Sequence, residues 1–174
     1  MDNFAEQLVK KNETSSDKAR RAVMLVVGIL FTVSLLLLSL LHFGGAMLSF
    51  LGLILAAAAG YGTYYYIQNT YVEYEYTFTN GELDVDKIIA KKKRKEMLST
   101  SIRKFTDFGK YEDGMEESAD MTVIMATDNI SSHEYYADFT DETVGSARLI
   151  FVPDERMLEN IRKFLPAKLR TKQQ

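Results

Sequence analysis

Three groups of residues in this 174-residue chain have types and spacings suited to chemistry. Asp107-Phe108-Gly109 matches the magnesium-binding triplet of phosphoryl-transfer enzymes, but the glycine-rich loop and the His-Arg-Asp loop that accompany it are missing. Asp84 and Asp86 would share one strand face, where two carboxylates without a third ligand favour a solvated surface over a cation site. His133 has no convincing serine-and-acid set around it. We therefore expect no enzyme, no metal centre and no cofactor.

A cationic run is the best candidate for a ligand contact, and it comprises Lys91, Lys92, Lys93, Arg94 and Lys95. Anionic lipid headgroups attract such residues by about 1 kcal/mol each near a bilayer surface. The alternative is a solvated strand or loop whose charges discourage edge-to-edge pairing of sheets. The formal net charge of −3 argues against a nucleic-acid binder, and the absence of cysteine excludes thiol chemistry.

A charge-free stretch from residue 22 to residue 72 dominates the first half of the chain. One bilayer crossing takes roughly 20 apolar residues. Residues 22–43 and 46–67 each meet that length, so we predict two transmembrane helices joined by a tight turn at 44–45. The first run is too long for the apolar core of a signal peptide. We expect His42, beside the turn, to be an interfacial polar residue.

Small residues recur at spacings of three or four along the second predicted span, at Gly45, Ser49, Gly52, Ala56 and Gly60. Such a stripe lets a neighbouring helix backbone approach closely. We expect it to pack against the first span. The alternative is a homodimer formed through the stripe.

The flanking charges predict the orientation of the hairpin. Lys18, Arg20 and Arg21 precede the first span, whereas the turn carries no fixed charge. Because positive flanks stay in the cytoplasm, we expect an integral membrane protein with both termini cytoplasmic. Within the N-terminal segment 1–21, Phe4, Leu8 and Val9 can share one face of a short amphipathic helix.

The remainder, 71–166, is predicted to be a soluble domain rich in strands. Residues 71–79 alternate between aromatic and polar side chains, and Asn80-Gly81 then gives the strongest short-range hairpin signal before a strand at 82–90. An exposed loop is expected at 110–120. Further strand signals lie at 96–98, 105–108, 121–126, 135–140 and 147–152.

A change to helical periodicity marks the end of this domain. Pro153-Asp154-Glu155 is typical of a helix start, and Pro166 ends the pattern. A basic tail follows at 167–174. We predict an α+β domain of about six or seven antiparallel strands closed by one C-terminal amphipathic helix. Its apolar face consists of Met157, Leu158, Ile161, Phe164 and Leu165.

A meander of strands ending in one helix resembles the pleckstrin-homology-like (PH-like) domain, in which the helix plugs an open barrel. The chain also resembles an uncharacterised bacterial family that joins a membrane hairpin to a PH-like domain. That resemblance covers nearly the whole chain and rests on Tyr-Val-Glu-Tyr-Glu-Tyr-Thr-Phe-Thr-Asn-Gly-Glu-Leu-Asp-Val-Asp, the Lys/Arg run, and Phe-Val-Pro-Asp-Glu-Arg-Met-Leu-Glu. It implies architecture, and it supplies no catalytic residues.

The function expected from this architecture is a cytoplasmic PH-like binding module anchored in a bacterial plasma membrane. Its ligand would be a protein or an anionic lipid surface. The alternative is a structural or accessory subunit of a larger integral membrane complex, in which the spans carry the assembly contacts. The two functions differ in where the partner binds, on the soluble domain or on the spans.

Overall fold

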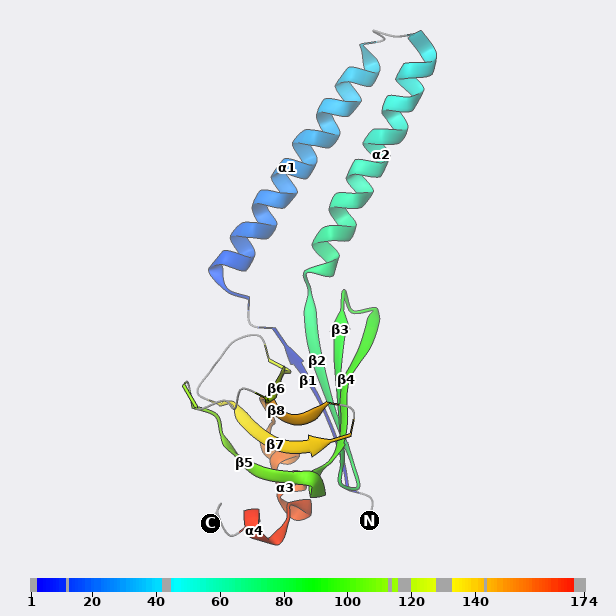
Figure 1. Ribbon diagram of the computed structural model, residues 1–174. Helices are drawn as coiled ribbons and strands as arrows, with labels where there is room; N and C mark the ends of the chain where they lie inside the picture. The colour runs from blue at the N-terminus through cyan, green and yellow to red at the C-terminus, as the bar shows by residue number, and fades with distance from the viewer. Residues whose placement is uncertain are drawn as a thin grey trace. The chain divides into compact units, whose positions relative to one another are not determined.

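The computed structural model describes residues 3–11, 13–41, 45–112, 114–115, 120–127, 133–142 and 144–170. The chain divides into two compact units (Figure 1). One is continuous and runs from Glu13 to Tyr71. The other is discontinuous, because it joins Met1–Asn12 to Val72–Gln174.

The continuous unit is a pair of helices packed along one another, α1 (Ser15–Leu40) and α2 (Gly45–Asn69). Both are long and apolar enough to cross a membrane. Their apolar side chains are largely exposed, as at Leu30 (61%) and Phe50 (66%), which suggests insertion into a bilayer. Helix α1 begins before the predicted span because Thr14 and Asp17 form a capping box. The predicted turn at 44–45 lies partly outside the described residues, since 42–44 are not described and Gly45 already belongs to α2.

Small residues set the close approach of the two helices. A Cβ atom on Gly28 would lie 2.2 Å from Thr63 Cγ2, and one on Gly52 would lie 2.9 Å from Ser39 Cβ. Of the predicted stripe, Gly52 and Gly60 face α1, Ala56 is buried, and the Ser49 carbonyl accepts a 2.6 Å hydrogen bond from Ser39 Oγ. A Cβ on Gly45 would meet nothing within 4 Å. The stripe therefore lies largely at an intramolecular contact.

The N-terminal segment differs from its prediction. Residues Phe4–Lys10 form strand β1, so the predicted amphipathic helix is wrong. Strand β1 pairs antiparallel with β2 (Val72–Thr79) from Phe4↔Thr79 to Lys10↔Glu73. The edge of β2 decides this conformation, because strand formation depends on pairing with a distant neighbour more than on local propensity. The helical unit is thus inserted between the first two strands of the other unit.

The first sheet has the order β1-β2-β3-β4, with β3 at Glu82–Ile89 and β4 at Lys93–Ser101. A short 3-10 helix, η1 (Ile102–Lys104), leads into the second sheet. That sheet has the order β5-β7-β8-β6. Its strands are β5 (Phe105–Lys110), β6 (Thr122–Met125), β7 (Tyr135–Asp141) and β8 (Gly145–Phe151).

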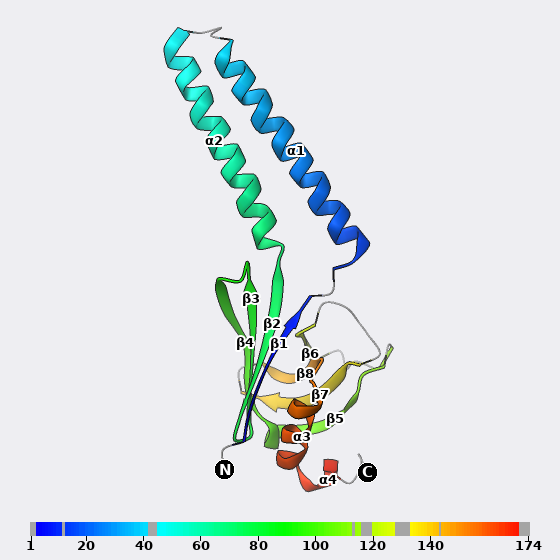
Figure 2. The ribbon, with the colours of Figure 1, turned by 180° about the vertical axis from the view of Figure 1, so that it is seen from behind.

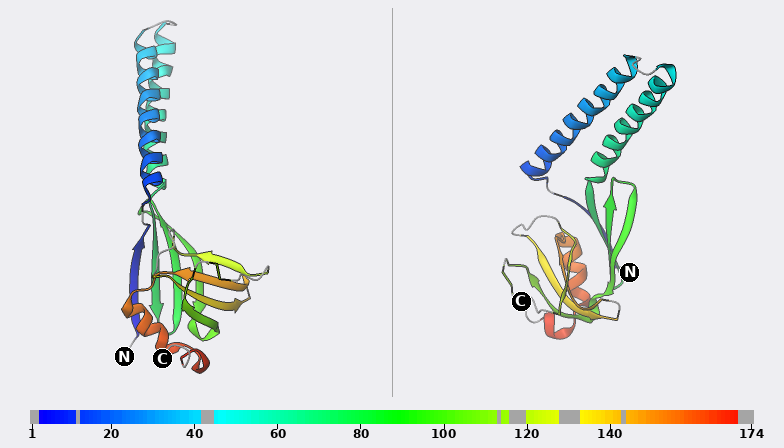
Figure 3. Two further views of the ribbon diagram at one scale, coloured as in Figure 1. Left: turned by 90° about the vertical axis from the view of Figure 1, so that its left-hand side faces the viewer. Right: turned by 45° about the horizontal axis from the view of Figure 1, so that its top comes forward.

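The described residues form eight strands in place of the predicted six or seven, and β1 is among the additions. Seen from the side, the strands of the second sheet run across those of the first (Figure 3). The prediction of an entirely antiparallel arrangement is wrong at one place, because β6 pairs with β8 in parallel. Strand β6 enters the sheet after a long connection from β5, and such a connection allows either direction.

Helix α3 (Glu155–Phe164) contacts β1, β2 and η1 (Figure 2). Asp154 caps it by accepting a 2.7 Å hydrogen bond from Met157 N. Met157, Ile161 and Leu165 are fully buried, as the predicted apolar face requires. The predicted basic tail begins as a further helical turn, α4 (Ala167–Arg170), because Leu169 is buried in the same core.

Candidate functional site

The predicted cationic run lies at the turn between β3 and β4. Ala90 and Lys91 both have φ of 56°, in the left-handed region, and Lys92 N donates to Ile89 O at 3.1 Å. Lys93, Arg94 and Lys95 open strand β4, and all five cationic residues are exposed. The run is therefore partly turn and partly strand.

Strand register separates these cations onto two faces. Lys95 lies directly opposite Lys87, and Lys87 in turn lies opposite Tyr74, with its Nζ 5.7 Å from the centre of the Tyr74 ring. Lys93 and Lys95 share this face because residues two apart on a strand point the same way. Lys87 is not recognisable from the sequence as part of this group, since only the pairing of β3 with β4 brings it beside the run.

Arg94 points to the opposite face and is occupied there. It forms an ion pair with Glu75 and lies 3.6 Å from Asp86. Glu75 and Asp86 are directly opposite each other in β2 and β3, so Arg94 offsets the repulsion between them. We define the basic surface as Lys87, Lys91, Lys92, Lys93 and Lys95; no described ion pair involves these five lysines.

The basic surface lies at one particular end of the first sheet. Ile89, just before the turn, pairs with Val72, the first residue of β2. Strand β1 also ends here, because Lys10 pairs with Glu73 and Lys11 N donates to Val72 O at 3.3 Å. The chain leaves the sheet for the helical hairpin, and returns from it, at this end.

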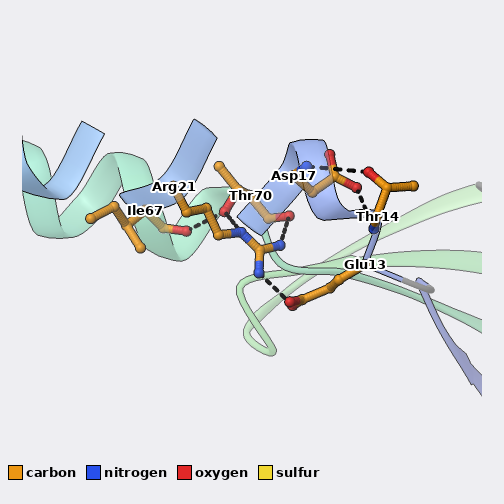
Figure 4. A network of polar contacts seen from close by, with 6 residues as sticks. All are labelled: Glu13, Thr14, Asp17, Arg21, Ile67 and Thr70. Atoms are coloured by element: carbon orange, nitrogen blue, oxygen red, sulfur yellow. Dashed lines mark hydrogen bonds and ion pairs between the residues drawn. The ribbon is translucent and has the colours of Figure 1, made fainter. Parts of the chain in front are cut away.

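A polar network joins the two helix ends at the base of the hairpin (Figure 4). The Arg21 guanidinium donates to Thr70 Oγ1 at 2.8 Å and to Thr70 O at 3.2 Å, and it forms an ion pair with Glu13. It also lies 4.1 Å from the centre of the Tyr71 ring. The neighbouring Arg20 makes a single 3.2 Å bond to Tyr66 Oη. In the sequence, Arg21 is recognisable only as a topology signal, because its partners Thr70 and Tyr71 are distant along the chain.

Other residues that the sequence singled out make contacts within the fold. Tyr136 Oη donates to Asp107 Oδ2 at 3.0 Å, and Phe108 belongs to the core. Burial, and then the Asp107 contact, raises the pKa of Tyr136 to about 12. Asp84 accepts a 2.5 Å hydrogen bond from Ser99 Oγ. Within the described ranges, no three His, Cys, Asp or Glu side chains gather as metal ligands would.

Two adjoining surface hollows of about 500 and 580 Å³ are shared by Lys110, Tyr135 and Arg162. The exposed His133 lines the larger one. Both linings contain cations and carboxylates, with Glu112 in one and Glu159 in the other. This mixture of charges selects neither an anionic nor a cationic ligand.

The comparison with protein families identifies the architecture and no ligand. A model described as a bacterial PH-like domain, DUF6106, matches residues 1–171. No curated protein and no solved structure matches the chain. The family match includes both β1 and the helical hairpin, so the inserted hairpin is part of the family's pattern. The chain belongs to the bacterial PH-like domain family DUF6106.

Proposed function

We propose that this protein is a membrane-anchored binding module, whose PH-like unit is displayed in the cytoplasm against an anionic bilayer surface. The observation that carries the proposal is the insertion of two apolar helices between the paired strands β1 and β2. The PH-like unit is an open barrel in this proposal, with α3 as its plug. Its ligand surface is the basic surface at the β3–β4 turn.

The strand pairing supports a hairpin that enters and leaves the bilayer on one side. Strands β1 and β2 are hydrogen-bonded along their whole length, so the residues before α1 and after α2 belong to one folded sheet. A single crossing, or three, would put these strands on opposite sides of the membrane. Lys18, Arg20 and Arg21 then favour the cytoplasmic side for both.

The position of the basic surface supports contact with lipid headgroups. Only Thr70 and Tyr71 separate α2 from β2, and an extended residue spans at most about 3.6 Å. The β3–β4 turn begins beside the first residue of β2. Lys87 and Lys95 also lie directly opposite each other on neighbouring strands, and an anion between them would offset the repulsion between their two positive charges.

Amine labelling of the full chain in lipid nanodiscs tests the lipid contact. In anionic nanodiscs, the five lysines of the basic surface should react more slowly than in zwitterionic nanodiscs. The difference should shrink between 0.1 M and 1 M salt, where the Debye length falls from about 10 Å to about 3 Å. Lys110 and Lys163, on β5 and α3, are internal controls. Equal labelling in both lipids at low salt would contradict the contact.

Cysteine labelling tests the orientation, because the chain has no native cysteine. Single cysteines at Asn12 and Ser132 should both resist a membrane-impermeant thiol reagent in intact cells and react after lysis. Labelling of both in intact cells would invert the orientation. Labelling of one alone would exclude the hairpin.

Purification from membranes in mild detergent tests the alternative function, an accessory subunit of a larger complex. Stoichiometric integral membrane partners that bind the isolated hairpin would favour that alternative. The proposed module instead predicts that such partners are absent and that the bilayer surface itself is the ligand.

A further inference from the structure

We propose that β1 is a releasable strand through which the membrane hairpin controls the PH-like unit, with Arg21 as the residue that holds β1 in place. The proposal rests on the insertion of the hairpin in the bilayer. If the start of α1 and the end of α2 moved apart, β1 would be pulled away from β2 and their hydrogen bonds would break. The hairpin would thereby act as a sensor of its surroundings as well as an anchor.

Strand β1 is held by far less apolar contact than β2. Only Ala5 of β1 is fully buried, whereas Phe4 and Leu8 are 47% and 49% exposed. By contrast, β2 buries Tyr76 and Phe78 completely. Segments with little buried apolar surface open locally before the rest of a fold. Strand β1 is therefore held in the first sheet by less buried apolar surface than its neighbour β2.

Most of the contacts that hold β1 are polar and reversible. Gln7 Nε2 donates to Val152 O at 2.9 Å, and Gln7 Oε1 accepts from Asp154 N at 2.8 Å. Arg156 Nη2 donates to Phe4 O at 3.3 Å. Release of β1 would break the contacts with the segment that leads into α3, and it would free the hydrogen-bonding edge of β2. An exposed edge of this kind accepts a strand from another chain.

The connectors are short enough to transmit a change at the helix ends. Lys11 still donates to Val72 O, and only residues 12 and 13 lie between it and the Thr14 cap of α1. Paired strands lie about 4.8 Å apart, whereas packed helices lie about 8–10 Å apart. Only a few residues along the chain separate the paired strands from the paired helices on each side.

Arg21 links the two chain ends of the helical hairpin. It binds Glu13 on one connector and Thr70 on the other, and it stacks on Tyr71. Its side chain is only 14% exposed. Arg20 carries the same charge next to it, but it binds only Tyr66 among the described hydrogen bonds. A comparison of substitutions at the two arginines therefore distinguishes the effect of losing the polar network from the effect of losing a charge at the membrane edge.

Hydrogen exchange of the full chain in nanodiscs tests the coupling. Arg21→Gln should speed exchange of the β1 amides about tenfold or more, while amides of β7 and β8 keep their protection. Arg20→Gln, the matched control, should leave β1 unchanged. If Arg21→Gln prevents insertion, Thr70→Val removes the hydroxyl that accepts from Arg21 Nε and keeps the charge. It should speed β1 exchange in the same direction by a smaller factor.

A cross-link then shows whether β1 is the element that moves. Glu6 and Thr77 lie directly opposite each other, so cysteines at both positions can lock β1 to β2. The oxidised pair should abolish the effect of Arg21→Gln, and reduction should restore it. Unchanged β1 exchange in both Arg21→Gln and Thr70→Val, or an equal rise in Arg20→Gln, would overturn the proposal. These readouts do not depend on which side the PH-like unit faces or on lipid charge, so they can fail while the proposed function stands.

Discussion

The two tight turns of the first sheet each contain two successive residues with positive φ, and the residue types differ between the turns. Asn80 and Gly81, between β2 and β3, have φ of 51° and 101°. Ala90 and Lys91, between β3 and β4, both have φ of 56°. Asn-Gly suits two successive left-handed residues, whereas Ala and Lys place a Cβ where it meets the following carbonyl.

The surroundings of the two turns explain the difference. Asn80 N donates to Asn3 O at 2.9 Å, Ile102 N donates to Gly81 O at 2.8 Å, and the Phe164 ring covers Gly81. The first turn thus belongs to the packed end of the domain. The second has the basic surface around it, and a left-handed Ala-Lys pair keeps a lysine at its tip. The second turn retains backbone strain that the first turn avoids, and under the proposed function this strained turn presents Lys91 within the basic surface.

The largest expected effect is from Gly81→Ala. Its new Cβ would lie 2.7 Å from Phe164 Cδ1 at a φ of 101°, so backbone strain and a clash combine. We expect a loss of about 3 kcal/mol in the free energy of unfolding. Urea unfolding of the full chain in detergent would measure it. Gly145→Ala is the control, because its φ is 71° and nothing lies within 4 Å of a Cβ there; equal losses would mean that packing at the first turn contributes nothing.

The opposite change in the free energy of unfolding, an increase, is expected when the residues of the first turn are placed in the second turn. The double change Ala90→Asn and Lys91→Gly should raise the free energy of unfolding by about 1–2 kcal/mol, because it relieves two strained left-handed residues. Labelling of the four remaining lysines should still depend on anionic lipid. Urea unfolding and nanodisc labelling measure the two results. A loss of stability would show that the turn is not strained.

A smaller loss in the free energy of unfolding is expected from Arg94→Gln. This change distinguishes the roles of the two faces of the β3–β4 hairpin. Glu75 is only 9% exposed and would lose its cation, which we expect to cost about 1 kcal/mol, since Arg94 itself is 60% exposed. Protection of the basic surface by anionic lipid should not change, because Arg94 points to the other face. If lipid protection falls instead, Arg94 belongs to the contact.

The smallest effect is expected from Lys95→Gln. Relief of its direct opposition to Lys87 should raise the free energy of unfolding by at most about 0.5 kcal/mol. Lys104→Gln is a suitable control, because Lys104 has a 2.8 Å ion pair with Asp141 to lose. A clear destabilisation by Lys95→Gln would mean that Lys95 makes favourable contacts within the fold.

Local patterns predicted the parts of the fold that form through neighbouring residues. The charge-free stretch predicted two long apolar helices, the alternation before Asn80-Gly81 predicted the β2–β3 hairpin, and the apolar face from Met157 to Leu165 predicted α3. Each feature depends on residues within one helix or one strand pair, so each can be recognised in a short window of sequence. The cationic run was likewise visible from residue type alone.

Tertiary structure alone decided the features that depend on distant partners. Phe4–Lys10 is a strand because it pairs with β2 across the inserted hairpin, and β6 is parallel because β8 accepts it in that direction. In the candidate site, register added Lys87 to the basic surface and removed Arg94 by pairing it with Glu75. Composition and periodicity thus determined the elements. The free energy of long-range pairing determined which of them meet and which charges remain available.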